Sequence, residues 1–442
     1  MFDLLITNAN LPDGRAGIDI AIRQGRIAAL GPKLGGTAHE VIDATGRLVS
    51  PPFVDPHFHM DATLSLGLPR LNRSGTLLEG IALWGELKPQ LTHEAVIERA
   101  MRYCDLAVSQ GLLAIRSHVD ICDDRLLAVE ALLDVKRRVA PYITLQLVAF
   151  PQDGYLRSPN AVQNLKRALD MGVDVVGGIP HFERTMADGA DSVRQLCRIA
   201  ADRGLLVDLH CDETDDPLSR HVETLAEQTT LLGLEGRVAG SHLTSMHSME
   251  NYYVSKLLPL MAEARLHAIA NPLINICIQG RHDSYPKRRG LTRIREMLDM
   301  GINVAFGMDC VMDPWYSLGT GDVLDAAHMA VHVAQMTSID AMNQCFAAVT
   351  TGAAAAMQLP DYGIAVGHPA DMVLLDARDA VEAIRLRPPR LAVIKSGSVI
   401  ARSMPRQSSL ALAGRPDGVA PADYAPKLAG NSSAMPGPAR TV

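Results

Sequence analysis

The segment Leu48–Asp61 reads LVSPPFVDPHFHMD and carries two histidines, His57 and His59, two positions apart. Phe53 and Val54 begin an apolar run suited to a buried strand, and three prolines exclude a helix here. Because side chains alternate along a strand, both imidazoles point to the same side and can reach one cation. Alone, such a pair is more often just two polar residues at a strand end. A metal site therefore requires further ligands at the ends of later strands.

The composition is typical of a globular protein with a large core. The chain has 442 residues, of which 48% are hydrophobic and 21% are charged. A net charge of −7 argues against nucleic acid as a partner. No apolar run is long enough to span a bilayer, and Leu4–Ile6 is typical of a strand rather than of a signal peptide. Seven scattered cysteines without a C-x-x-C pair predict free thiols and a cytoplasmic location.

The middle of the chain, residues 51–359, alternates short apolar runs with amphipathic stretches. Helical spacing is clear in 93–109, where Thr92 is a candidate N-cap. Eight strand–helix repeats predict an α/β fold, a (β/α)8 TIM-type barrel. A doubly wound sheet is the alternative, although it seldom needs eight parallel strands in succession. The expected strands are Phe53–His57, Leu112–Val119, Ile143–Phe150, Val173–Ile179, Leu205–His210, Val238–His242, His267–Asn271 and Asn303–Gly307.

Both ends of the chain carry a different pattern. Short alternating runs broken by glycines fill residues 1–50 and predict a small antiparallel sheet, and similar runs return in 360–405. We expect the two ends to form one small β-sandwich domain beside the barrel. Residues 406–442 are rich in Gly, Pro, Ala and Ser and lack apolar periodicity, so we expect a flexible C-terminal tail.

Polar residues gather at the predicted carboxyl ends of several strands, where the active site of such a barrel lies. Together with His57 and His59, His210 and Asp309 make a plausible site for one divalent metal, Zn²⁺ or Fe²⁺. Glu213 follows His210 by three residues and is a candidate proton shuttle. His242 ends the sixth strand and could orient the attacking water, although a core histidine bonded to a backbone carbonyl is the alternative.

The fourth predicted strand contains no lysine. A two-metal site bridged by a carboxylated lysine therefore lacks its usual bridge, and the sequence favours one metal. His181 and Glu183 follow this strand. They either line the site or have a structural role next to the residues that line it.

With these residues assembled, the chain resembles the deaminases of the amidohydrolase superfamily, and most of all bacterial cytosine deaminases. The resemblance covers about residues 3 to 402. The matching stretches are PPFVDPHFHMD (51–61), SGTLLEG (74–80), VAFPQ (148–152), GIPHFE (178–183), HCDE (210–213), SH (241–242), ANPL (270–273), QGR (279–281), YPKRRG (285–290) and DPWY (313–316).

This resemblance implies hydrolysis of cytosine to uracil and ammonia, with the metal on His57, His59, His210 and Asp309. It further implies that Glu213 carries protons to the ring and that His242 holds the attacking hydroxide. Asp309 is a third catalytic candidate, because it can take the proton of the water while it remains on the metal. Gln152 would pair with the polar edge of the pyrimidine. Trp315 would form part of the wall of the substrate pocket. The alternative is that its ring packs in the protein core below the rim of the barrel. The family also implies a homo-oligomer.

Two positions, on either side of the ligand aspartate, depart from the family pattern. Cytosine deaminases of this type carry a second aspartate directly after the ligand aspartate, where this chain has Cys310, and Met308 stands where histidine is usual. A thiol is smaller and normally neutral. If Cys310 faces the C5 edge of the substrate, a 5-methyl group fits without burying a charge against it. We therefore expect activity on 5-methylcytosine, with the alternative that Cys310 only packs against the barrel wall.

Two other functions remain compatible with the sequence. The first is an aminohydrolase of another amino-substituted ring, such as isoguanine, a triazine or a pterin, because the same metal ligands would serve. The second is a non-catalytic metal-binding scaffold, which predicts lost ligands or a lost proton shuttle. Neither loss is seen.

Overall fold

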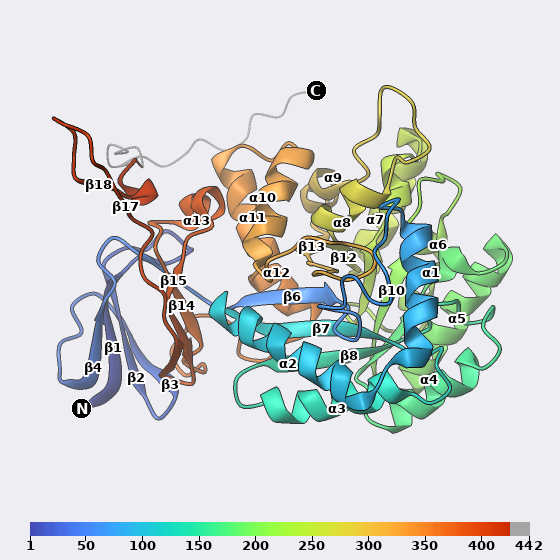
Figure 1. Ribbon diagram of the computed structural model, residues 1–442, viewed down its shortest axis with the longest axis horizontal. Coiled ribbons are helices and arrows are strands. Elements are labelled where there is room, and N and C mark those ends of the chain that lie inside the picture. Colours follow the sequence, from blue (N-terminus) through green and yellow to red (C-terminus); the bar gives the residue numbers. More distant parts are fainter. Residues whose placement is uncertain (425–442) are drawn as a thin grey trace.

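Eight parallel strands form the central sheet of the computed structural model, which describes residues 1–424 (Figure 1). Neighbouring strands in the sheet are also neighbours along the chain, from the first to the eighth. All eight strands expected from the apolar runs are present, so the predicted barrel is confirmed. The strands are β6 (Phe53–Phe58), β7 (Leu112–Asp120), β8 (Thr144–Phe150), β9 (Val175–Gly178), β10 (Leu206–Cys211), β11 (Val238–His242), β12 (His267–Ala270) and β13 (Asn303–Phe306).

The first and last strands meet just beyond the end of β13. The N–H of Asp309 donates to the carbonyl of His57 at 2.9 Å, and the N–H of His59 donates to the carbonyl of Asp309 at 3.0 Å. Phe58 and Asp309 form a parallel bridge. These bonds close the barrel at its carboxyl mouth, and they use the residues expected to bind the metal.

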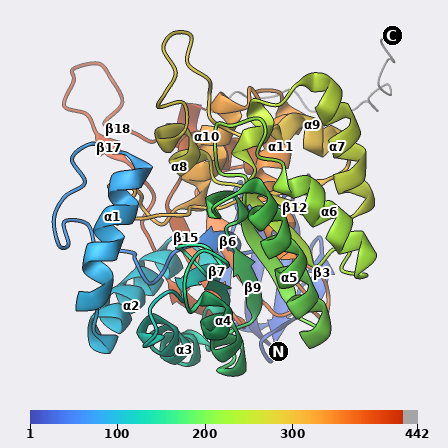
Figure 2. The ribbon, with the colours of Figure 1, turned by 90° about the vertical axis from the view of Figure 1, so that its right-hand side faces the viewer.

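Helices surround the strands, as the view in Figure 2 shows. Helix α2 illustrates why these segments are helical and pack on the strands. Thr92 caps its N-terminus by accepting a hydrogen bond from the N–H of Ala95, and its buried face carries Val96, Ala100 and Cys104. The helices are α1 (Leu77–Leu87), α2 (His93–Ser109), α3 (Leu127–Val139), α4 (Ala161–Asp170), α5 (Met186–Arg203), α6 (His221–Leu231), α7 (Asn251–Glu263), α8 (Pro272–Ile278), α9 (Ile294–Asp299), α10 (Val323–Val333), α11 (Ile339–Ala348), α12 (Thr351–Ala356) and α13 (Ala380–Leu386). Short 3-10 turns are η1 (Lys88–Gln90), η2 (Pro180–Phe182), η3 (Thr244–His247) and η4 (Pro421–Tyr424).

Two four-stranded sheets lie beside the barrel and share one apolar core, which includes Ile6 and Ile20 from one sheet and Met372 and Ile394 from the other. The first sheet has the order β3-β2-β1-β4 and the second has the order β16-β15-β14-β5. The two ends of the chain therefore pack together, as expected. Their strands are β1 (Phe2–Ala9), β2 (Ile18–Arg23), β3 (Arg26–Gly31), β4 (Ala38–Asp43), β5 (Leu48–Ser50), β14 (Met372–Leu375), β15 (Arg390–Lys395) and β16 (Ser398–Ala401).

The expectation of one antiparallel N-terminal sheet was wrong in two respects. Strand β4 crosses to the far edge of β1 and pairs with it in parallel. Strand β5 leaves this sheet and pairs with β14, a strand from the other end of the chain. Both differences are long-range pairings, which the local alternation of apolar residues does not specify.

Part of the expected flexible tail has regular structure. Strand β17 (Ser408–Ser409) pairs antiparallel with β18 (Gly418–Val419), and η4 follows. The remainder of the predicted tail, residues 425–442, lies outside the described residues.

Within residues 1–424, no helix is long and apolar enough to cross a membrane. All seven cysteines are free thiols.

Candidate active site

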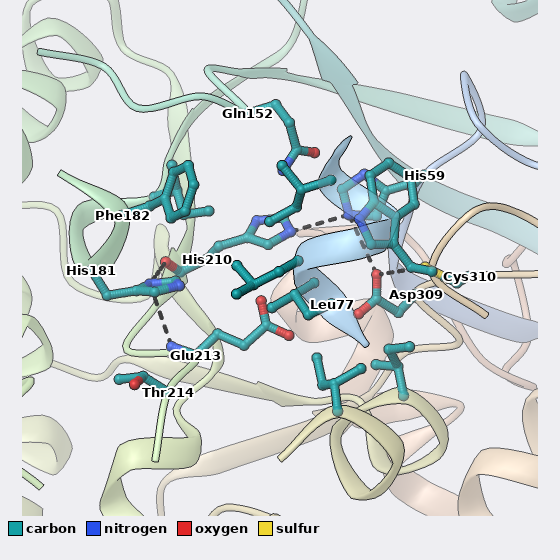
Figure 3. Close-up of a pocket in the computed structure, with 16 residues that line it drawn as sticks. His59, Leu77, Gln152, His181, Phe182, His210, Glu213, Thr214, Asp309 and Cys310 are labelled. Atoms are coloured by element: carbon teal, nitrogen blue, oxygen red, sulfur yellow. Dashed lines mark hydrogen bonds and ion pairs between the residues drawn. The ribbon is translucent and has the colours of Figure 1, made fainter. Parts of the chain in front are cut away.

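The four expected metal ligands converge at the carboxyl mouth of the barrel. His57 and His59 come from the end of β6, His210 comes from β10, and Asp309 follows β13. The Nε2 atom of His59 lies 3.1 Å from Nε2 of His210 and 3.3 Å from Oδ1 of Asp309 (Figure 3). The Nε2 atom of His57 lies 3.7 Å from the same carboxylate oxygen. The donor atoms of His57, His59 and Asp309 lie within 4.8 Å of one another, and those of His57, His210 and His242 form a second such group. Three separated segments therefore bring the expected ligands together at one mouth of the barrel.

The chemistry of this donor set fits a divalent cation. Burial lowers the pKa of His59 to about 3, so its imidazole is neutral and carries a lone pair. The Nε2 atom of His57 is buried and has no hydrogen-bond partner among residues 1–424. Two ligands about 2.1 Å from a tetrahedral zinc ion lie roughly 3.4 Å apart, close to the separations found here. Neutral imidazoles with one carboxylate suit Zn²⁺ and Fe²⁺ alike.

Glu213 and His242 lie next to these ligands. The Nδ1 atom of His242 is 3.1 Å from Oε1 of Glu213, and its Nε2 atom is 3.7 Å from Oδ2 of Asp309. Burial, and after it the charge of Asp309, raises the pKa of Glu213 well above its ordinary value. Glu213 can therefore hold a proton at neutral pH and release it to a bound molecule.

Strained backbone aims two of these side chains. His242 and Asp309 have φ angles of 72° and 64°, in the left-handed region that non-glycine residues rarely adopt. His242 is the last residue of β11, and Asp309 lies three residues beyond the end of β13. The strain is stored at the residues nearest the candidate chemistry, as is common at functional sites.

Asp212 fixes the turn between His210 and Glu213. Its φ angle is 54°, and its carboxylate accepts hydrogen bonds from Nδ1 of His221 at 2.7 Å and from the N–H of Val222 at 2.9 Å. Both partners belong to the first turn of α6, whose N-terminus favours a negative charge. The segment that carries the candidate ligand His210 and the candidate proton shuttle Glu213 is thereby tied to a helix.

A cavity of about 240 Å³ opens beside the donor atoms (Figure 3). His59, His210, Glu213 and Asp309 form its polar floor. Its other walls are largely apolar, with Gln152 as one polar group among them. The lining also includes Leu77, Leu78, Ile81, Ile179, His181, Phe182, Thr214, Ile274, Ile278, Cys310 and Trp315. The three residues expected to contact substrate, Gln152, Cys310 and Trp315, thus all line one cavity with three of the four expected metal ligands.

Trp315 and Cys310 close one side of this cavity. The indole of Trp315 lies with its ring centroid 6.1 Å from that of His59 and 5.7 Å from that of Trp84. The Sγ atom of Cys310 lies 3.5 Å from Oδ1 of Asp309. Burial, and after it the nearby carboxylates, raises the pKa of the Cys310 thiol well above its ordinary value. The thiol is therefore neutral beside the candidate metal ligand.

The sequence left open whether His181 and Glu183 line the site or support it, and the two have different surroundings. His181 lines the cavity, and its Nδ1 atom lies 3.1 Å from the carbonyl oxygen of His210. Glu183 instead accepts hydrogen bonds from the backbone N–H groups of Tyr155, Leu156 and Arg157. It therefore holds the loop after β8 in place.

Sequence reasoning missed His118 on β7. Its ring centroid lies 4.2 Å from that of His57 and 4.5 Å from that of His210. Neither ring nitrogen has a hydrogen-bond partner within the described part of the chain, although the side chain is fully buried. The signal was present, because His118 lies near the carboxyl end of the second expected strand. Arg116 on β7, Asp208 on β10 and Ser241 on β11 were also given no role.

Known proteins resemble this chain over most of its length. The model of the amidohydrolase family matches residues 40–402. The structure of 5-methylcytosine deaminase from Klebsiella pneumoniae, liganded with 5-fluorocytosine, is 42% identical, with a TM-score of 0.88 over 91% of this chain and 98% of that one. N-isopropylammelide isopropyl amidohydrolase of Pseudomonas sp. (strain ADP) is 28% identical over 91% of this chain and 98% of its own length.

Pterin deaminase of Rhizobium rhizogenes is 28% identical over 89% of this chain and 90% of its own length. The relatives thus span nearly the whole chain, and their names describe hydrolysis at several kinds of substrate. With a family match over most of its length and a mouth of the barrel that can hold a divalent metal, this chain belongs to the amidohydrolase family and is a hydrolase acting on C–N bonds.

Proposed function

We propose that this enzyme is a metal-dependent deaminase of cytosine-type pyrimidines, with 5-methylcytosine as its preferred substrate. The observation that carries the proposal is the neutral thiol of Cys310 in the cavity wall, next to Asp309. A carboxylate at this position would have to be buried against the 5-methyl group, at a large desolvation cost. The likeness to 5-methylcytosine deaminase at 42% identity supports the same substrate.

The size of the cavity supports a small flat ring. Its volume of about 240 Å³ lies below the range of about 300–1,000 Å³ found for pockets of drug-sized ligands. Phe182, Ile179 and Trp315 offer apolar walls for the ring faces, and the amide of Gln152 can both donate and accept at the polar edge of the pyrimidine.

The proposed reaction converts the base and one water into the keto base and ammonia. A divalent metal held by His57, His59, His210 and Asp309 would lower the pKa of a water from 15.7 to roughly 7. His242 hydrogen-bonds and orients the attacking oxygen. Glu213 gives its proton to the ring nitrogen next to the amine-bearing carbon. The hydroxyl group added to that carbon then loses its proton to Asp309 or Glu213, and Glu213 delivers a proton to the leaving amine as the C–N bond breaks. Proton transfer of this kind is worth about 10²–10⁴-fold in rate.

A direct test compares cytosine and 5-methylcytosine as substrates of the wild type and of Cys310→Asp. We expect the wild type to favour 5-methylcytosine in kcat/KM and the aspartate variant to lose about 10–200-fold on this base relative to cytosine, the range that one methyl contact commands. Cys310→Ala is the matched control, since it is also small and neutral and should keep the preference. Equal handling of 5-methylcytosine by the aspartate variant and the wild type would refute the assignment.

A second candidate is deamination of another amino-substituted ring. The likeness to pterin deaminase and to N-isopropylammelide isopropyl amidohydrolase favours it. Ammonia release across cytosine, 5-methylcytosine, isoguanine, a triazine and pterin, with defined Fe²⁺ and Zn²⁺ loading, separates the two candidates. Turnover of none of these bases by metal-loaded protein would instead favour a non-catalytic scaffold.

The proposal includes a homo-oligomer acting in the cytoplasm, as implied by the family resemblance and the free cysteines. Light scattering on the purified full-length chain measures its mass in solution. A monomer mass would refute the oligomer and leave the assignment of the reaction intact.

A further inference from the structure

A chain of hydrogen bonds leads from His57 into the interior of the barrel, away from the cavity. The Nδ1 atom of His57 lies 2.8 Å from Oγ of Ser241, and this hydroxyl donates to Oδ1 of Asp208 at 2.7 Å. Arg116 donates from Nη1 to the other oxygen of Asp208 at 3.0 Å. All four side chains are fully buried. They come from β6, β11, β10 and β7, so these hydrogen bonds connect four strands of the barrel.

The bonding partners fix which group donates and which accepts in each of these three hydrogen bonds. Asp208 acts only as an acceptor, because it receives the guanidinium of Arg116 on one oxygen. The hydroxyl of Ser241 has a single proton, and it is donated to Asp208. Ser241 therefore offers a lone pair to His57, so Nδ1 of His57 carries the hydrogen. The lone pair of the ring then lies on Nε2, the atom that faces Asp309.

Arg116 anchors the far end. Its guanidinium also donates to Oε1 of Gln146 at 3.0 Å and to the carbonyl of Ala356 at 2.9 Å. A buried ion pair is tolerated when its remaining donors are satisfied in this way. The carboxylate of Asp208 is thereby held at a fixed place behind Ser241.

We propose that Ser241 and Asp208, held by Arg116, are positioning residues that fix the tautomer and the ring orientation of His57 for the metal. The proposal rests on the metal site of the proposed function. Loss of a partner behind a metal-binding histidine typically weakens metal binding by about 10–100-fold.

The decisive measurement is the apparent Kd for Zn²⁺ of the full-length protein in chelator-buffered zinc. We expect Ser241→Ala to raise this Kd by about 10–100-fold. Asp208→Asn should raise it further, because an asparagine amide can donate to Ser241, which then donates to Nδ1 and moves the proton of His57 to Nε2. Ser192→Ala is the matched control. Its hydroxyl is equally buried, but its one hydrogen bond within the described residues is to the carbonyl of Gly189 in α5.

A second readout reports the coordination itself. Cobalt-substituted wild-type protein and the Ser192→Ala control should share one visible absorption spectrum, and Ser241→Ala should show a changed one. Unfolding of the metal-free variants by urea shows whether each is folded. If Asp208→Asn does not fold, Ser241→Ala alone decides the test.

The outcomes separate the two proposals. A wild-type protein that binds no Zn²⁺ refutes the metal site and with it the proposed function. Tight binding by the wild type with an unchanged Kd and an unchanged cobalt spectrum in Ser241→Ala refutes only the positioning role.

Discussion

Glu213 and His242 are paired inside the protein, with Oε1 of the carboxyl group 3.1 Å from Nδ1 of the ring. Both side chains are more than nine-tenths buried. Burial raises the pKa of Glu213, so the pair keeps a proton beside the cavity floor. The groups that would deliver a proton and orient water are therefore held against each other before any substrate arrives.

Replacing Glu213 by glutamine should remove the proton donor while keeping the shape. We expect Glu213→Gln to lower kcat by about 10²–10⁴-fold, because an amide cannot supply a proton to the ring. Its Zn²⁺ content should equal that of the wild type, since Glu213 is not among the proposed ligands. Steady-state ammonia release and metal analysis test both points. Glu227→Gln, on the exposed side of α6, is the control and should behave as the wild type. Retained turnover in Glu213→Gln would exclude the shuttle role.

Helix α1 approaches Trp315 through a glycine. A Cβ atom added at Gly80 would lie 2.5 Å from Cδ1 of the indole and 3.1 Å from the carbonyl oxygen of Pro314. We expect Gly80→Ala to lower the free energy of unfolding by about 1–3 kcal/mol through overpacking. It should also raise KM, because the cavity wall must move. Urea unfolding and substrate kinetics measure the two effects.

Gly85→Ala provides the control on the same helix. A Cβ atom at Gly85 would meet nothing within 4 Å, so this variant should gain about 0.5–1 kcal/mol from helix propensity. If both variants gain stability and keep KM, the contact between α1 and Trp315 does not shape the cavity.

Removal of the metal should abolish turnover without unfolding the protein. Chelator-treated enzyme should regain activity when Fe²⁺ or Zn²⁺ is supplied, and comparison of the two identifies the better cofactor. Because the ion binds only the folded state, its presence at 100 times Kd should add about 2.7 kcal/mol to the free energy of unfolding. Turnover that survives complete removal of divalent metal would contradict the assignment.

The stability of the metal-free protein should depend on pH through His181. Burial lowers the pKa of this imidazole from 6.5 to about 4 in the folded protein. Between these values the unfolded chain binds the extra proton, so this group makes the free energy of unfolding fall as pH falls from 6.5 towards 4.

His181→Gln should therefore remove up to about 1.4 kcal/mol per pH unit from the slope of unfolding free energy in this window. Urea unfolding of metal-free wild type and variant at several pH values between 5 and 6.5 gives the difference. Parallel slopes for the two proteins would show that His181 titrates freely in the folded state.

Much of the barrel could be predicted because its strands are continuous apolar runs. Residues such as His210 and Asp309 stand out as polar residues at the ends of these runs, where a barrel places its chemistry. The strand order followed from the regular alternation of strand and helix. The same reasoning could not place β4 and β5, since their partners are decided by long-range pairing.

The hydrogen bonds that link His57 to Ser241, Asp208 and Arg116 also escaped prediction, and the physical reason is different. Arg116 and Asp208 lie within apolar strands, where a charge is costly unless a distant partner satisfies it. That partner comes from another strand, and spacing along the sequence does not reveal it. The left-handed backbone of His242 and Asp309 was likewise invisible, because neither residue is a glycine.

The backbone of Asp309 is hydrogen-bonded to the residues on both sides of Phe58, so His57, His59 and Asp309 close the barrel with their backbones and offer their side chains to the proposed metal ion. During synthesis the N-terminal histidines emerge early, yet nothing can complete their coordination until the eighth strand has left the ribosome. An ion bound at the proposed site would join the first strand of the barrel to the segment after its last strand. Metal supply should thus govern how fast newly made chains reach the native state, as well as how fast the mature enzyme works.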